Sequence, residues 1–167
     1  MKQIIIINGK GGSGKDTVCD IVKKYYKVIV VSSIDCIKDI AAYGGWDRQK
    51  DLKGRKLLSD VKSAFTEYND LPFKKMMLEI EGFLNAKDYQ FLFIHIREPE
   101  EIKKLVDKYP NIKTLLVRRE ELNSPYGNRS DDGVENYNYD FVFDNNGTLE
   151  DLEKDFITFF NTNFMKE

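Results

Sequence analysis

A glycine-rich segment lies between two apolar stretches near the start of this 167-residue chain, and it constrains the fold more than any other feature. It reads Asn8-Gly9-Lys10-Gly11-Gly12-Ser13-Gly14-Lys15-Asp16-Thr17. The aliphatic run before it predicts a buried strand, and the stripe of Val18, Ile21 and Val22 after it predicts a helix. Glycine permits positive φ angles and close approach to the main chain. A strand, a tight turn and a helix therefore follow one another directly.

The spacing of Gly9, Gly14 and Lys15 satisfies the pattern G-x4-G-K in the strand-to-helix context that this pattern requires. In such a loop, main-chain N–H groups and the positive end of the helix bind phosphate oxygens, while the lysine contacts the β- and γ-phosphates. The sequence therefore predicts a site for ATP. The expected cofactor-binding residues are Gly9, Gly11, Gly12, Ser13, Gly14, Lys15, Asp16 and Thr17.

Asp16 departs from the usual pattern, because Ser or Thr normally stands there and binds Mg²⁺. Two interpretations of Asp16 stay open. Its carboxylate either binds the metal ion or one of its water molecules, or it is a first-turn residue that interacts favourably with the helix dipole. Thr17 is the better candidate for a hydroxyl that faces the phosphates. Asp16 and Thr17 are the candidate Mg²⁺ ligands.

Five short apolar runs rich in β-formers predict strands, and residues at helical spacing fill the intervals between them. Alternating strands and helices predict a three-layer α/β fold of the P-loop NTPase type, with a five-stranded parallel sheet covered on both faces. We expect residues 1–167 to form a single domain of this kind. The runs are Gln3–Ile7, Val28–Ser32, Phe91–Ile96, Thr114–Val117 and Phe141–Phe143.

Charge and composition exclude several other classes. The formal net charge is −2, which disfavours a partner such as a long nucleic acid. No apolar run is long enough to span a membrane, and the short one after Met1-Lys2 is a poor signal peptide, so we expect a cytoplasmic protein. Cys19, Cys36 and the single histidine, His95, favour neither a disulfide framework nor a histidine-rich metal site.

Two common classes of nucleotide hydrolase also fit poorly. Asp51-Leu52-Lys53-Gly54 matches the D-x-x-G pattern of GTPases, but it does not follow a strand, and no Asn-Lys-x-Asp pattern occurs. An ATPase motor has an acid at the end of a neighbouring strand. The corresponding run here, Phe91–Ile96, contains His95 and leads into Arg97 without such an acid.

The loop Gly12–Thr17 resembles the S-G-K-D-T loop of the bacteriophage-type deoxynucleoside monophosphate kinases, and it is similar to the G-K-x-T loops of adenylate-kinase-like enzymes. Further likenesses follow in the same order as in that family. The main departure is His95, which stands where the family has a strand-end aspartate that contacts the metal. The similar segments are Ile37–Asp39, Arg55–Leu58, Ile94–Arg97, Leu116–Arg119 and Asp144–Glu150.

This resemblance implies a fold like that of nucleoside monophosphate kinases and transfer of the ATP γ-phosphoryl group to a nucleoside or deoxynucleoside monophosphate. It implies an acceptor-binding helical insert at about 34–88 and a lid at about 118–135. Lys38, Arg55 and Arg97 would hold the acceptor phosphate, and Asn145 and Gly147 would form a turn against the adenine. The catalytic residues would be Lys15, Arg97, Arg118, Arg119 and Arg129.

Other interpretations stay open beside this one. Arg97 could instead form an ion pair with Glu98 or Glu100, and His95 could be a strand-end histidine with an ordinary hydrogen-bond partner. The acceptor could be another small phosphorylated metabolite, since phosphomevalonate kinase of the animal type has a similar G-K-D loop. A nucleotide-binding protein without turnover and an acceptor-independent NTPase are the remaining alternatives. The sequence favours no particular oligomeric state.

Overall fold

The computed structural model describes residues 2–119 and 133–165. All five expected strands are present, each within one residue of its expected bounds. They are β1 (Gln3–Asn8), β2 (Val28–Ser32), β3 (Phe91–His95), β4 (Lys113–Arg118) and β5 (Phe141–Asp144). The helices are α1 (Lys15–Tyr25), α2 (Asp35–Tyr43), α3 (Leu52–Asn69), α4 (Leu71–Asn85), α5 (Pro99–Lys108), the short 3₁₀ helix η1 (Val134–Asn136) and α7 (Leu149–Phe164).

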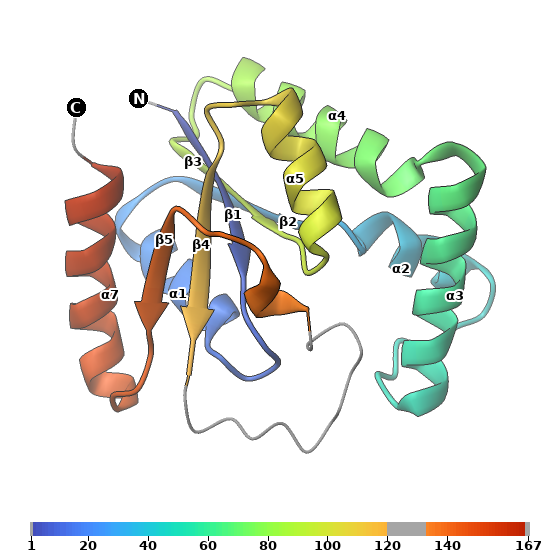
Figure 1. Cartoon of the computed structure of the whole chain (residues 1–167), viewed down its shortest axis with the longest axis horizontal. Coiled ribbons are helices and arrows are strands. Elements are labelled where there is room, and N and C mark those ends of the chain that lie inside the picture. The colour runs from blue at the N-terminus through green and yellow to red at the C-terminus, as the bar shows by residue number, and fades with distance from the viewer. Residues whose placement is uncertain (1, 120–132, 166–167) are drawn as a thin grey trace.

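The strands form one sheet in the order β2-β3-β1-β4-β5, and every pair is parallel (Figure 1). The expected α/β class with a five-stranded parallel sheet is therefore confirmed. β1 lies in the centre, with Ile7 opposite His95 of β3 and Asn8 opposite Leu116 of β4. Because all strands run the same way, the residues that follow them gather at one edge of the sheet.

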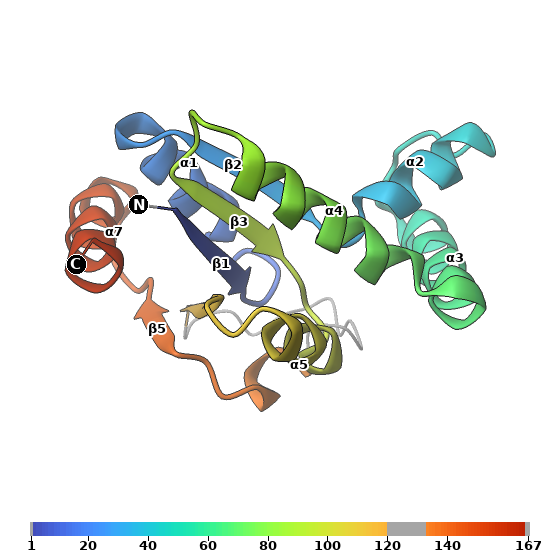
Figure 2. The same ribbon diagram turned by 90° about the horizontal axis from the view of Figure 1, so that it is seen from above.

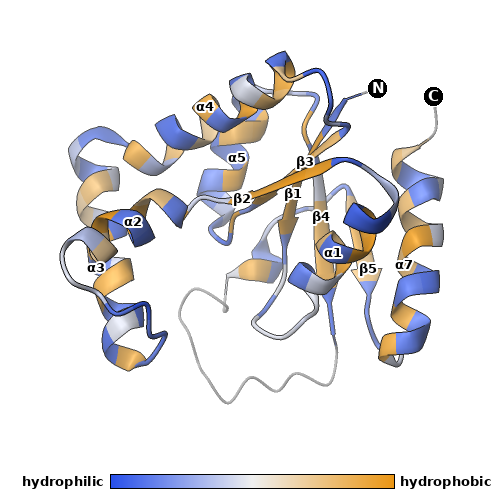
Figure 3. Cartoon of the chain, turned by 180° about the vertical axis from the view of Figure 1, so that it is seen from behind, coloured by the Kyte–Doolittle hydropathy of each residue, from blue (hydrophilic) through white to orange (hydrophobic). Residues whose placement is uncertain are grey.

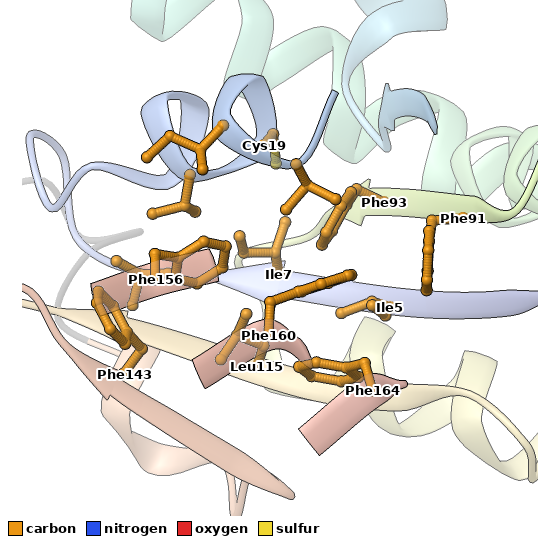
Figure 4. Close-up of a cluster of buried hydrophobic side chains, with 14 of the residues drawn as sticks. Ile5, Ile7, Cys19, Phe91, Phe93, Leu115, Phe143, Phe156, Phe160 and Phe164 are labelled. Atoms are coloured by element: carbon orange, nitrogen blue, oxygen red, sulfur yellow. The ribbon is translucent and has the colours of Figure 1, made fainter. Parts of the chain in front are cut away.

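Alternate residues of β1, β2 and β3 supply two separate hydrophobic cores. On one face, Ile5 and Ile7 pack with α1 and α7, where Phe156 and Phe160 are fully buried (Figure 4). On the other face, Ile4 and Ile6 pack with residues of α4 and α5 (Figure 2). Both faces are covered, which explains why the strands are nearly uniformly apolar whereas the helices alternate (Figure 3).

Helices α2 and α3 lie to one side of the sheet (Figure 2) and pack around a small third cluster of Ile37, Ala41 and Leu58. The Asp51 side chain caps α3 by accepting a 2.7 Å hydrogen bond from the Gly54 N–H. Among the described residues, no helix combines the length and the apolar composition needed to cross a bilayer.

Candidate functional site

The glycines of the loop between β1 and α1 are required by its geometry. Gly12 and Gly14 have φ angles of 81° and 99°. A Cβ on Gly14 would lie 2.5 Å from Asn145 Nδ2, and one on Gly9 would lie 2.3 Å from the Val117 carbonyl oxygen. The main chain thus packs too closely against β4 and Asn145 to accept side chains at these two positions.

Lys15 begins α1 and folds back over this loop. Its Nζ donates hydrogen bonds to the carbonyl oxygens of Gly9, at 2.7 Å, and Lys10, at 3.0 Å. The helix is capped by Gly14, which offers the first turn no side-chain hydrogen bond. The Ser13 hydroxyl is buried and has no hydrogen-bond partner among the described residues. An ammonium group, a helix N-terminus and a hydroxyl in need of a partner together fit the phosphates of a nucleotide.

Asn145, which follows the edge strand β5, holds the phosphate loop in place. Its side-chain Nδ2 donates a 2.9 Å hydrogen bond to the Ser13 carbonyl, and its main-chain N–H donates to the Arg118 carbonyl at 2.7 Å. The family resemblance suggests Asn145 and Gly147 as a turn beside the adenine. In the structure Asn145 is buried and braces the phosphate loop, while Gly147 precedes the capping box that Thr148 and Asp151 form at the beginning of α7.

Asn8 forms a second brace, which nothing in the sequence distinguishes. Its Oδ1 accepts from the Gly9 N–H at 2.8 Å, and its Nδ2 donates to the Arg97 carbonyl and to the Tyr139 hydroxyl. That hydroxyl donates onward to the Val134 carbonyl at 2.7 Å. Burial raises the pKa of Tyr139 to about 12, so the hydroxyl keeps its proton. An asparagine at a strand end does not reveal such a bracing role in the sequence, because its hydrogen-bond partners come from distant segments.

His95, Asp16 and Cys19 meet beside the loop. His95 Nε2 lies 3.8 Å from Asp16 Oδ1 and 3.7 Å from Cys19 Sγ. Burial lowers the pKa of His95 against an opposing effect of Asp16, so its imidazole is neutral at pH 7. Burial also raises the pKa of the Cys19 thiol. Within residues 2–119 and 133–165, no three or more His, Cys, Asp and Glu side chains are arranged to hold a metal ion.

The three residues expected to bind the acceptor phosphate lie on different elements. Arg97 lies two residues after the end of β3, is partly buried, and accepts a hydrogen bond from Asn8 with its main-chain carbonyl. Lys38 on α2 pairs with Asp35 at 2.8 Å, and exposed Arg55 on α3 donates from Nε to the Lys50 carbonyl. The Asn8 side chain therefore connects the Arg97 main chain directly with the loop.

The candidate lid residues are only partly described. Arg118 ends β4 and pairs with Asp144 at the end of β5, with 2.7 Å between Nε and Oδ1. Arg119 is exposed. Arg129 and most of the segment at about 118–135 lie outside the described residues. Lys10 of the phosphate loop pairs with Glu135 at 3.3 Å, so the end of this segment contacts the loop.

Lys62 on α3 forms ion pairs with the beginning of α5. Its Nζ lies 2.8 Å from Glu98 and 2.9 Å from Glu101, at the beginning of α5, and its side chain is 12% exposed. Burial alone would raise the pKa of Glu98, but Lys62 brings it below the usual value. Burial and the neighbouring Glu98 raise the pKa of Glu101. In the sequence Lys62 looks like any solvated lysine on a helix.

A cavity of about 160 Å³ opens next to this ion pair. It lies between α3, α4 and α5, below the ends of β2 and β3. Apolar side chains meet carboxylates around it. The lining includes Ser33, Phe73, Met76, Ile96, Glu100 and Glu101.

Solved structures with the same arrangement of elements were found, all at low sequence identity. TT1252 from Thermus thermophilus has a TM-score of 0.53 and 19% identity, covering 97% of this chain and 98% of its own. An unliganded sugar kinase from Janibacter sp. HTCC2649 has a TM-score of 0.54 and 12% identity, covering 96% and 95%. A structure from Chloroflexus aurantiacus j-10-fl has a TM-score of 0.51 and 11% identity, covering 98% and 96%.

The chain has the P-loop NTPase fold. In this chain the phosphate loop follows the central strand of the order β2-β3-β1-β4-β5, and the similarity to these structures extends over nearly its whole length. No protein-family model matches the sequence, and neither does any curated protein. The expected fold class is thus confirmed, whereas the specific kinase family stays a hypothesis.

Proposed function

We propose that this protein is an ATP- and Mg²⁺-dependent phosphotransferase whose acceptor is a small phosphorylated molecule, a nucleoside or deoxynucleoside monophosphate. The observation that carries the proposal is the placement of Lys15. Its ammonium group donates to the carbonyls of Gly9 and Lys10, in a glycine-rich loop between a strand and a helix N-terminus. ATP supplies the transferred phosphoryl group, and Mg²⁺ would be held by Asp16 or Thr17 together with the nucleotide.

The neighbouring residues support transfer to an acceptor rather than hydrolysis. A phosphate acceptor is already anionic, so the protein mainly aligns the two substrates and neutralises charge with cations. Arg97 follows β3, which pairs with β1. Lys38, Arg55, Arg118, Arg119 and Arg129 are further candidate cations for the acceptor or the transferred group.

The cavity beside α4 and α5 supports an acceptor with an organic part. Its apolar wall at Phe73 and Met76 suits a flat or aliphatic group, and Glu100 and Glu101 suit N–H or hydroxyl donors. We assign the base or sugar of the acceptor to this cavity, with its phosphate toward Arg97.

The test is a coupled ADP-release assay over all ribo- and deoxyribonucleoside monophosphates and phosphomevalonate. Signal with one acceptor class supports the proposal and defines the substrate. Lys15→Ala should remove the signal without unfolding the chain, whereas Lys23→Ala should not, because Lys23 forms an exposed pair with Asp20 on the same helix. Undiminished phosphoryl transfer by the Lys15→Ala variant would contradict the proposal.

One observation favours a second candidate, a nucleotide-binding protein without turnover. His95 stands at the strand end where a metal-binding acid is expected, and its pKa is lowered by burial. ATP binding without ADP release for any acceptor would favour this candidate.

A further inference from the structure

Two side chains with metal-binding atoms face each other beside the phosphate loop. Asp16 lies in the first turn of α1, directly after Lys15, and His95 ends β3. The distance between Asp16 Oδ1 and His95 Nε2 is 3.8 Å. The Asp16 side chain is 93% exposed and the His95 side chain 16% exposed, so the carboxylate is free to move while the ring is held within the fold.

This distance is close to what a shared metal ion requires. A carboxylate oxygen and an imidazole nitrogen that bind one ion at about 2.1 Å as neighbouring ligands lie about 3.4 Å apart in tetrahedral geometry and about 3.0 Å apart in octahedral geometry. A movement of the exposed Asp16 carboxylate by about 0.4–0.8 Å closes the difference. The buried sulfur of Cys19 lies 3.7 Å from the same nitrogen, so the thiol and the Asp16 carboxylate both approach His95 Nε2.

The two side chains do not form a complete site by themselves. No arrangement of three or more such ligands occurs in the described part of the chain. The phosphate oxygens of a nucleotide held by Lys15 and the loop would supply the missing ligands, as they do for metal ions in phosphoryl-transfer sites generally. Metal binding should therefore depend on the nucleotide.

We propose that Asp16 and His95 jointly bind the metal ion that accompanies the nucleotide, and that this nitrogen ligand makes the site prefer a divalent transition-metal ion to Mg²⁺. This inference rests on the proposed nucleotide site. Mg²⁺ prefers oxygen ligands and near-ideal octahedral geometry, whereas imidazole strengthens binding of Mn²⁺ and, further along the series, Co²⁺.

The chain offers a sharp test because His95 is its only histidine. In the untagged protein with ADP and Mn²⁺, pulsed EPR should show nitrogen coupling from an imidazole, and that imidazole can only be His95. The coupling should vanish in His95→Gln. Bound Mn²⁺ without any imidazole coupling in the wild type would overturn the inference.

Calorimetric titration of ADP gives an independent readout. With Co²⁺ in place of Mg²⁺ the wild type should bind ADP at least about tenfold more tightly, and His95→Asp, which restores an oxygen ligand, should reduce this ratio severalfold. Asp16→Asn should weaken binding with both ions while leaving thermal unfolding unchanged, because Asp16 is exposed. An equal ratio in wild type and His95→Asp overturns the inference.

The experiments distinguish failure of the metal inference from failure of the proposed function. If ADP binds with Mg²⁺ but neither nitrogen coupling nor a preference for Co²⁺ is found, the metal inference fails and the proposed function stands. If ADP binds with none of the three ions, the proposed function fails, and the metal inference fails with it.

Discussion

The buried side-chain amide of Asn145, which follows β5, donates a 2.9 Å hydrogen bond to the carbonyl of Ser13 in the phosphate loop. The two residues are separated by 132 positions in the sequence. This bond makes the shape of the loop depend on the last strand of the sheet. The loop is therefore set by the finished fold rather than by its glycines alone.

Replacing Asn145 with alanine should lower the free energy of unfolding by about 1–3 kcal/mol, because the buried Ser13 carbonyl loses its partner. ADP binding should weaken as well, since the loop is no longer held. Urea unfolding and ADP titration measure the two effects. The control is Asn161→Ala, which removes only an exposed contact with Tyr26 and should cost less than about 0.5 kcal/mol. Equal losses in both variants would contradict the bracing role.

Gly14 and Gly45 form a matched pair of positions for testing whether the Asn145 side chain requires a glycine in the phosphate loop. Both have positive φ angles, of 99° and 95°, so alanine should cost roughly 1–2 kcal/mol of backbone strain at either position. Only at Gly14 does the added Cβ also collide, at 2.5 Å from Asn145 Nδ2, whereas nothing lies within 4 Å at Gly45. Gly14→Ala should thus lose more stability and lose ADP binding, while Gly45→Ala keeps it. Retained ADP affinity in Gly14→Ala would show that the loop tolerates a displaced Asn145.

Tyr139→Phe should destabilise the protein by about 1–2 kcal/mol. The hydroxyl that is removed accepts from Asn8 Nδ2 and donates to the Val134 carbonyl, both at 2.7 Å. Its pKa, raised to about 12 by burial, keeps the donor protonated at neutral pH. Tyr137→Phe is the control, because Tyr137 packs its ring against Tyr139 at 5.1 Å. Thermal unfolding that does not distinguish the two variants would count against the Asn8 brace.

Lys62→Met should lower the free energy of unfolding by about 2 kcal/mol at pH 7, because Glu98 and Glu101 keep their charges without a cation. This value lies between those typical of surface ion pairs and of buried ion pairs. Lys56→Met removes an exposed pair with Asp60 and should change little. Chemical denaturation of both variants measures the difference.

The same variant should show a distinctive pH dependence. In the wild type, Glu98 has a pKa below 4.5, so its contribution is present above pH 4.5 and is lost as the pH falls through the folded-state value. Without Lys62 the pKa values of both glutamates rise, and acid neutralises the unpaired charges. The deficit of Lys62→Met should therefore shrink as the pH falls from 7 toward 5. A constant deficit over this range would argue that Lys62 acts by packing alone.

The strands and the phosphate loop could be predicted because their signals are local. A run such as Ile4–Ile7 can only be buried on both faces, and the spacing of Gly9, Gly14 and Lys15 between a strand and a helix is typical of phosphate-binding loops. The polar braces could not be predicted. Asn8 and Asn145 stand at strand ends, where an asparagine that contacts a ligand and one that supports a loop look the same. Their partners are chosen by the order of the strands, which the local pattern does not contain.

The order of the strands also affects how the chain is made. β1 and β2 leave the ribosome first, yet they do not pair with each other: β1 pairs with β3 and β4, and β2 pairs with β3. A nascent chain that ends before Phe91 therefore carries two apolar strands and no sheet. β3 is the segment that joins them, and until it emerges the Ile4–Ile7 run is open to association with other chains. Synthesis of this protein should depend on chaperone protection that lasts until β3 is available.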